Sequence, residues 1–490
     1  MKQIFIKLYL FTLLFTNLIS SCTKNKSEAP YFGNGIHNGW ADQTSITLWT
    51  RLTQNPDGNA GGYEFIDISP LEANALDEEG NKDKINAAQI PKGLSLDDMI
   101  GACPGSEGLV RLKYYPTKND RRVIKEKWVE VDVEKNYTKQ WKLRNLEPGT
   151  KYIVELSSKR KKFALVSSRI TGSFSTPPAE DIYESIEFCI VTCHDYIRKD
   201  TTNGHKIYKA MMDINPDFYV HTGDIEYYDK PRPWALTEEM MYFKWDRLFA
   251  LPLQREFWSG VTSYFMKDDH DALKNDAWSG MRYGTVSWER GLEIFEEEQF
   301  PSHEKFYKTI RWGKDLQIWI TEGRNYRSPN DAVDGPGKTI FGEEQKEWLC
   351  RTLKESDATF KVIINANPIL GPDRDNKYDN YSNSNYRYEG DEIREFIDQF
   401  DNVFLCNGDR HWQYVTHFEG TDLWEFSCGA GSDEHAGGWD QRDVRPEHKF
   451  LRVKGGFLRG HVSRENGPPT LTFQHMDVYG NVVHEERFIR

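Results

Sequence analysis

Hydrophobic and polar residues alternate along the first part of the chain. Such alternation is typical of strands that bury one face. It predicts strands at 44–51, 128–133, 153–156 and 170–176. Pro177 and Pro178 stop the last of these. Residues 31–178 are therefore expected to be all-β, with the polar stretch 55–108 as a long insertion between strands.

A short motif at 146–152 indicates which β architecture this is. Leu146-Glu147-Pro148-Gly149-Thr150-Lys151-Tyr152 resembles the corner of fibronectin type III-like sandwiches. In that corner a tyrosine hydroxyl bonds back across the turn before a strand. We therefore expect residues 31–178 to form an N-terminal fibronectin III-like β-sandwich.

The rest of the chain alternates strand and helix patterns. Strands are predicted at 186–192, 217–221, 261–266, 316–320, 360–364 and 403–406, and helices at 206–214, 343–354 and 391–399. Residues 471–483, with Tyr479-Gly480-Asn481 as the turn, indicate a closing hairpin. Residues 185–490 are thus expected to form a layered α/β domain.

The first 22 residues have the pattern of a targeting segment. Lys2 and Lys7 precede an apolar stretch at 8–19, which is too short to be a convincing membrane span. Ile19-Ser20-Ser21-Cys22 resembles a bacterial lipobox, so Cys22 is the predicted lipidated residue and the protein is expected in the cell envelope, anchored to a membrane. An ordinary secretory signal with a chance cysteine is the alternative.

Composition narrows the possible partners. The net charge of −13 argues against nucleic acid, because phosphate backbones attract Lys and Arg. A hydrophobic content of 38% is enough for a substantial core. Seven cysteines become six after Cys22 is set apart. Export permits disulfides, but their pairing cannot be read from spacing.

Residues that bind metals stand where four predicted strands end. Cys193, Asp224 and Tyr227 follow the first two of these strands, and Asp409 and His411 follow a later one. Each has an ordinary alternative, since cysteines at strand ends are commonly inert packing residues and tyrosines are commonly buried and hydrogen-bonded. Their shared position at strand ends favours a metal centre.

The segment Asp268-Asp269-His270-Asp271 follows another predicted strand. One of its acids is expected to bind metal, and a neighbouring carboxylate is expected to hold His270. A solvated acidic loop is the alternative. His194, next to Cys193, is a candidate for a group behind the metal or for a substrate contact.

Arginines and amides complete the list of candidates. Arg324 and Arg327 stand at a strand end and suit bidentate binding of an anionic ester, with a surface salt-bridge patch as the alternative. The insertion 371–390 is expected to build the substrate pocket. Its Asp379 and Asn380 are candidate substrate contacts, although such loops are also commonly just solvated.

Together these segments resemble the alkaline phosphatase D (PhoD-like) branch of the calcineurin-like metallophosphoesterases, over essentially the whole chain after the leader. The matching motifs are Thr192-Cys193, Asp224 to Tyr227, Asp268 to Asp271 with Asn275, Glu322 to Arg327, and Asp409 to His411. Three positions depart from the family pattern: Thr192 replaces a serine, Asp271 a glutamate and Glu322 an aspartate. No histidine follows the strand at 360–364, where Asn367 is a substitute ligand.

The resemblance implies a layered αββα domain with two metals. One site would hold Cys193, Asp224, Tyr227 and His411, a set that suits Fe³⁺. The other would hold Asp269, Asp409 and Asn367, with Asp224 as the bridge, and suits Ca²⁺ or another divalent cation. The resemblance also places Asn275 near the substrate.

The implied activity is hydrolysis of phosphate monoesters or diesters by a metal-bound hydroxide. His270 would contact the phosphoryl oxygen or protonate the leaving group, and Arg324 and Arg327 would bind nonbridging oxygens. The partner would be an anionic ester, either a small molecule or a polysaccharide.

Two other functions fit the same residues. A sulfate ester presents similar oxygens, so the metal site also suits desulfation of polysaccharide. The other alternative is a binding protein and not an enzyme: a glycan-binding lipoprotein whose metal centre has lost its activity. An iron-free, colourless protein would support that last function.

Overall fold

The computed structural model describes residues 29–465 and 467–490. The leader 1–22 and the lipobox cysteine Cys22 therefore lie outside the described residues. No helix in the described part of the chain is long and apolar enough to cross a membrane.

The first part of the chain contains two antiparallel sheets. One has the order β1 (Ile36–Gly39), β2 (Ile46–Arg51), β6 (Thr138–Leu143). The other contains β3 (Leu109–Pro116), β4 (Ile124–Lys125), β5 (Val129–Glu130), β7 (Lys151–Lys159) and β8 (Ser168–Ser175). Leu48, Leu112 and Leu156 of the two sheets belong to one buried core. The corner bond is present as predicted, because the Glu147 amide donates to the Tyr152 hydroxyl at 2.9 Å.

Two expectations for this part are wrong. The insertion 55–108 is not free of helix, since it contains α2 (Pro70–Glu79) and α3 (Lys82–Gln89), followed by the short 3-10 helix η1 (Leu96–Asp98). Ser69 and Glu72 form a capping box at the start of α2, which is the local reason that a helix begins there. The strand expected at 128–133 shrinks to the two residues of β5.

The second part of the chain contains two larger sheets. The six-stranded sheet has the order β11 (Thr262–Phe265), β10 (Phe218–His221), β9 (Ile186–Val191), β21 (Gly456–Ser463), β22 (Thr470–Asp477), β23 (Val482–Ile489). The seven-stranded sheet has the order β14 (Lys308–Trp312), β15 (Leu316–Ile320), β16 (Phe360–Asn365), β17 (Val403–Asn407), β19 (Trp424–Cys428), β18 (Gln413–His417), β20 (His448–Arg452). Strands β9, β10 and β11 run parallel, as do β15, β16, β17 and β19.

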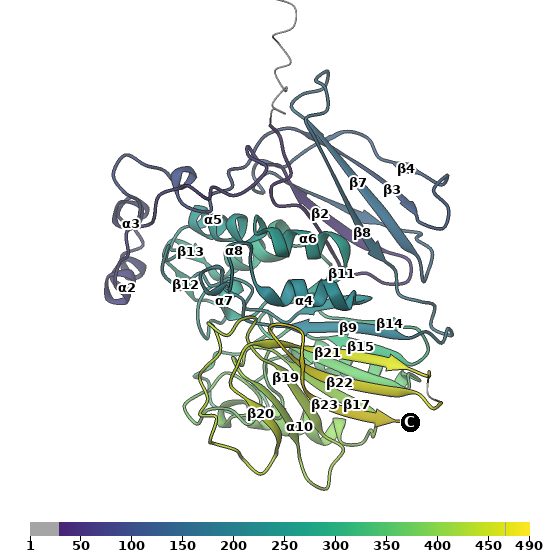
Figure 1. Cartoon of the computed structure of the whole chain (residues 1–490). Helices are drawn as coiled ribbons and strands as arrows, with labels where there is room; N and C mark the ends of the chain where they lie inside the picture. Colours follow the sequence, from purple (N-terminus) through teal and green to yellow (C-terminus); the bar gives the residue numbers. More distant parts are fainter. Residues whose placement is uncertain (1–28, 466) are drawn as a thin grey trace, which may run out of the picture.

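Helices cover the outer faces of these two sheets (Figure 1). Those on the six-stranded side are α4 (Lys206–Ile214), α5 (Glu238–Phe249) and α6 (Pro252–Gly260), and those on the other side are α9 (Gly342–Glu355) and α10 (Arg387–Ile397). The short elements are η2 (Tyr196–Arg198), α7 (Asp269–Ala272), β12 (Arg282–Tyr283), β13 (Val286–Ser287), α8 (Trp288–Glu293), the π-helical η3 (Ile294–Gln299) and η4 (Ser384–Tyr386). The layered α/β architecture is therefore as predicted, although α10 begins four residues earlier than the expected start at 391.

The alternation of side chains along the strands explains the layers. Phe188 and Ile190 of β9 face the core between the sheets, whereas Cys189 and Val191 face the helices. Because successive side chains of a strand point to opposite faces, a strand covered on both sides must be apolar throughout. This is why these central strands read as continuous apolar runs in the sequence.

The two parts of the chain are joined by buried contacts. Arg51 of β2 forms a buried ion pair with Asp246 of α5 at 2.9 Å. Trp49 of the same strand donates its indole hydrogen to the Glu298 carbonyl at 2.6 Å. All six described cysteines are free, so Cys193 is available as a ligand.

Two glycines allow four strand ends to meet. A Cβ on Gly408, just after β17, would lie 2.2 Å from the Thr222 hydroxyl oxygen and 2.6 Å from that of Thr192. A Cβ on Gly223, after β10, would lie 2.7 Å from the Cβ of Asp268. The loops after β9, β10, β11 and β17 can pack this closely only without those side chains.

We expect Gly408→Ala to destabilise the fold by about 1–3 kcal/mol, because the added methyl group overpacks a site bounded by two hydroxyls. Thermal unfolding measures this loss. The matched control is Gly61→Ala, where the added Cβ meets nothing within 4 Å. Equal melting temperatures for the two variants would contradict the close approach.

Candidate metal centre

A first cluster of ligands forms where β9, β10 and β17 end. One atom each of Cys193, Asp224 and His411 lie within 4.8 Å of one another. Cys193 Sγ lies 3.5 Å from Asp224 Oδ2. The Tyr227 hydroxyl lies 3.1 Å from the same oxygen and 3.3 Å from His411 Nε2. The four residues expected to share one metal are thus brought together.

A second cluster shares Asp224 with the first. Asp224, Asp268 and Asp409 each offer an oxygen within 4.8 Å of the others, and oxygens of Asp224 and Asp269 lie equally close to a ring nitrogen of His270. The Asn367 amide donates to Asp268 Oδ2 at 2.9 Å and to Asp409 Oδ2 at 3.1 Å. Asp269 was an expected ligand and Asp268 was not, although the acidic doublet was a signal for both.

The electrostatics of these clusters fit bound cations. Asp224 is buried, and within the described chain its Oδ1 has no hydrogen-bond partner. Burial first, and then the nearby Asp269 and Asp268, raise the pKa of Asp224 well above its ordinary value, although His270 opposes this. Burial and the charge of Asp224 also raise the pKa of Cys193. A cation reverses both effects, because it stabilises carboxylate and thiolate.

The backbone at these ligands is unusual. Cys193, Asp224 and Asp409 have φ values of 51°, 55° and 61°. Residues with side chains adopt this left-handed region at a cost, and such positions cluster at functional sites. The strand-to-loop turns therefore aim the three side chains into one space at the expense of local strain.

Asp271 holds the loop that carries Asp224. Its carboxylate accepts the backbone amide hydrogens of Asp224, Ile225 and Glu226 at 2.6, 2.8 and 3.2 Å. Thr192 connects the same loops, because its hydroxyl accepts from the Asp409 amide at 3.1 Å and donates to the Gly223 carbonyl at 3.2 Å. Both residues position ligands without offering atoms to a metal.

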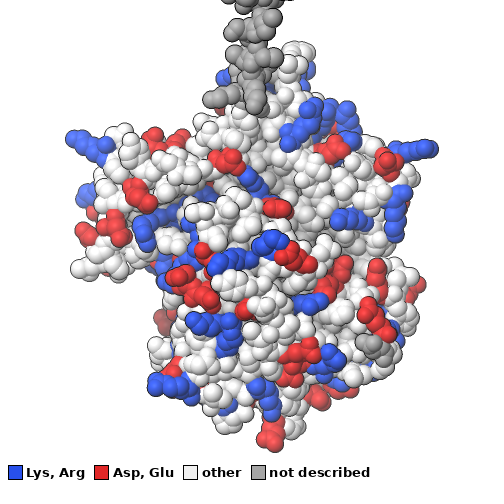
Figure 2. All heavy atoms as spheres, viewed as in Figure 1, with Lys and Arg blue, Asp and Glu red and all other residues white. Residues whose placement is uncertain are grey.

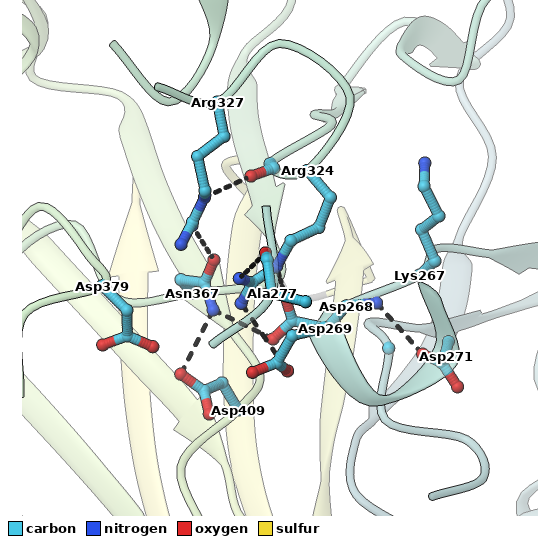
Figure 3. A network of polar contacts seen from close by, with 12 residues as sticks. Lys267, Asp268, Asp269, Asp271, Ala277, Arg324, Arg327, Asn367, Asp379 and Asp409 are labelled. Atoms are coloured by element: carbon cyan, nitrogen blue, oxygen red, sulfur yellow. Dashed lines mark hydrogen bonds and ion pairs between the residues drawn. The ribbon is translucent and has the colours of Figure 1, made fainter. Parts of the chain in front are cut away.

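Arg324 and Arg327, which were expected to bind an anionic ester, are buried and bond to other protein groups (Figure 3). Arg324 is fully buried and donates through Nε to Asp268. Arg327 donates to the Gly323 carbonyl at 2.9 Å and to Asn367 Oδ1 at 3.1 Å. Their guanidinium groups lie behind the second cluster and orient its oxygen donors.

His270 has the carboxylate partner that the sequence predicts, and that partner is Asp229, with Nδ1 and Oδ1 2.6 Å apart. Burial disfavours the imidazolium, but Asp229, Asp269 and Asp224 outweigh it and raise the pKa of His270 to about 10. The carboxylate of Asp229 therefore favours the protonated form of His270.

His194 lies behind the first cluster and not against a substrate. It is 1% exposed, and its Nδ1 lies 2.7 Å from His221 Nε2. The rings of His205 and His221 are 4.7 and 4.3 Å from its own. His194 thus belongs to a buried histidine cluster next to Cys193. This position suits a group behind the metal, which is one of its two predicted roles.

A cavity of about 360 Å³ opens over both clusters. It is lined by Arg198, Asp224, Tyr227, Lys230, His270, Asn275, Arg374, Lys377, Asp409, His411, Trp412, His435 and 436–438. Asn275 lines it, as expected. Four cations line it as well, and none of them was a candidate in the sequence analysis.

The insertion 371–390 reaches this cavity, but not through the residues expected. Asp379 and Asn380 are buried, and Asn380 donates to Asp373 at 2.8 Å. Arg410 lies next to them, 3.7 Å from Asp379, and pairs with Asp409 at 2.6 Å. Asp379 and Asn380 therefore support a ligand from behind, whereas Arg374 and Lys377 are the residues of this insertion that line the cavity.

Comparisons with known proteins bear on the family and the fold. Residues 293–467 match the family model of PhoD-like phosphatases. This span includes Asn367, Asp409 and His411 but lies after Cys193 and Asp224. A search of the curated proteins found no match.

Two solved structures share the fold. The structure of PhoD aligns with a TM-score of 0.66 and 16% identity, over 95% of this chain and 90% of that chain. A purple acid phosphatase from yellow lupin (Lupinus luteus) seeds aligns with a TM-score of 0.60 and 11% identity, over 94% of this chain and 75% of its own. At such low sequence identities the alignments show a metallophosphoesterase-like fold, and they do not show the substrate or the metals of this chain.

We expect Asp229→Asn to move the alkaline limb of the pH–kcat profile to lower pH. The carboxylate of Asp229 raises the pKa of His270, so its loss lets the imidazolium deprotonate at lower pH. The profile measures the shift, with unchanged metal content as the control for an intact centre. An alkaline limb at the same pH would show that His270 is not the titrating group.

Proposed function

We propose that this phosphoester hydrolase, which resembles the PhoD-like phosphatases in family model and in fold, hydrolyses phosphate monoesters or diesters in the cavity described above. The observation that carries the proposal is the meeting of Cys193, Asp224, Tyr227 and His411 at the wall of a cavity with four cations. Ligands for metal and groups for an anionic ester lie there together.

We propose Fe³⁺ at Cys193, Asp224, Tyr227 and His411, since thiolate, phenolate and imidazole suit that ion. We propose Ca²⁺ or another divalent cation at the oxygen-rich second cluster of Asp224, Asp268, Asp269 and Asp409. Once bound, the two cations supply positive charge for the phosphoryl group and a lowered pKa for a coordinated water.

His270 is proposed as the proton donor to the leaving alkoxide. It lines the cavity, and its ring lies 4.2 Å from that of Tyr227, which places it beside the first cluster. Asp229 fixes the ring through Nδ1, so Nε2 is the nitrogen left to donate. A histidine held in the charged form is suited to donate a proton as the ester bond breaks.

Arg374 and Lys230 are proposed to bind the substrate's anionic oxygens, in place of Arg324 and Arg327. Within the described residues, Lys230 has no ion-pair partner, and Arg374 has only the distant Asp373 at 3.6 Å. By contrast, Lys377 is already paired with Asp276 at 2.8 Å. Cations that lack close partners are the ones free to bind an incoming anion.

Three further assignments are proposed from the sequence. The protein is exported and held at a membrane of the cell envelope by a lipid on Cys22. The two N-terminal sheets are a fibronectin III-like accessory domain. The substrate is an anionic ester, borne by a small molecule or a polysaccharide.

We expect Asp224→Asn to lower turnover of p-nitrophenyl phosphate by at least about a hundredfold. Removing a residue that only supports a metal ligand already lowers activity by up to about a hundredfold, and Asp224 is proposed to be a ligand itself. The assay compares p-nitrophenyl phosphate with p-nitrophenyl sulfate, and elemental analysis follows iron and calcium. Near-full turnover by the variant would overturn the proposed centre. If the parent protein cleaves the sulfate ester in preference to the phosphate ester, the same centre is assigned to desulfation. If the parent protein is inactive and contains no iron, a binding role is supported.

We expect Arg374→Met to raise KM for the phosphate ester by about tenfold or more, the size of one lost charge-assisted hydrogen bond. Steady-state kinetics measure it, with Arg351→Met on the exposed face of α9 as the control. An unchanged KM would remove Arg374 from substrate binding.

A further inference from the structure

The hairpin that joins β7 to β8 has a composition unlike the rest of this acidic chain. Lys159 to Lys162 are four consecutive basic residues, in a protein whose net charge is −13. Phe163 and Leu165 follow them and are 92% and 90% exposed. Two large apolar side chains so fully exposed within one short turn need an explanation that the fold itself does not provide.

The positive charges of this hairpin are free to act on a partner. Within the described part of the chain, Arg160, Lys161 and Lys162 form no ion pair, and all three are exposed. Lys159 is different, since it is buried over the Trp128 ring at 4.3 Å and donates to the Lys162 carbonyl at 2.6 Å. Lys159 thus fixes the base of the hairpin and leaves three cations at its tip.

The hairpin stands beside the place where the described chain begins. Ser158, at the end of β7, donates its hydroxyl hydrogen to the Pro30 carbonyl at 2.6 Å. Figure 1 shows the β7–β8 hairpin rising next to that entry point, and Figure 2 shows Lys and Arg side chains on the surface around it. Only seven residues separate Cys22 from Pro30.

We propose that the tip of this hairpin, residues 160–165, docks on an anionic lipid bilayer. Basic side chains near a membrane surface are attracted to acidic headgroups, and exposed Phe and Leu side chains insert at the boundary with the acyl chains. The chain entry and the hairpin tip then contact the same surface. This inference goes beyond the phosphatase activity and does not depend on it.

The nearby acids do not cancel this surface. Glu107 and Glu130 line a groove on the flank of the hairpin together with Trp128 and Val133, and residues 159–163 of the hairpin line the same groove. The two acids lie toward the base of the hairpin, on the segments next to β3 and on β5, and neither forms an ion pair with the tip residues. The tip therefore keeps both features that a bilayer surface attracts, positive charge and exposed apolar area.

Vesicle sedimentation tests the proposal with the chain from Thr23 onward, so that every described residue is present and neither leader nor lipid contributes. We expect binding to vesicles of phosphatidylglycerol and phosphatidylcholine, weakened by salt, and little binding to phosphatidylcholine alone. Arg160→Gln/Lys161→Gln/Lys162→Gln should weaken partitioning by about tenfold or more, because each charge contributes separately near the surface. Phe163→Ser/Leu165→Ser should weaken it as well.

Matched controls separate the tip from general effects of charge and exposure. Lys82→Gln/Lys84→Gln/Lys92→Gln removes the same charge from the region of α3, and Val333→Ser removes another side chain that is 91% exposed. Both should bind vesicles like the parent, and p-nitrophenyl phosphate hydrolysis should persist in every variant.

Equal binding by tip and control variants, or equal binding to neutral vesicles, would overturn the proposal. Binding that dextran sulfate abolishes and that Phe163→Ser/Leu165→Ser leaves intact would overturn it in favour of a polyanionic glycan.

Discussion

Repulsion among buried carboxylates is the constraint on which the rest of this structure depends. Asp224, Asp268 and Asp269 are buried and meet Asp409, which is only partly buried, at one edge of the two sheets. Burying several negative charges together is unfavourable unless cations or hydrogen-bond donors compensate them. The proposed cations would compensate these carboxylates.

The surrounding chain meets this constraint with fixed donors. Arg324 lies against Asp268, Arg410 pairs with Asp409, and the backbone after β10 is tied to Asp271. These partners are buried, so they orient the oxygens without competing for substrate. The left-handed turns at the ligands add strain that the packed strands on either side absorb.

Positive charge gathers at two places on a protein that is negative overall. One is the cavity, where Arg374 and Lys230 face the space above the ligands. The other is the exposed tip of the β7–β8 hairpin. In both cases loops that follow strands present the cations.

Local sequence patterns predict the secondary-structure elements and most of the candidate ligands. Strands such as β15 and helices such as α4 follow from local periodicity, and Asp224 and Tyr227 share one turn, so their proximity is local as well. Tertiary structure decided which acid joins which cluster, that Arg324 and Arg327 face inward, and that Asp379 lies behind the site. Those outcomes depend on side-chain directions set by loops far apart in sequence, because a residue after a strand end points wherever its packed neighbours allow.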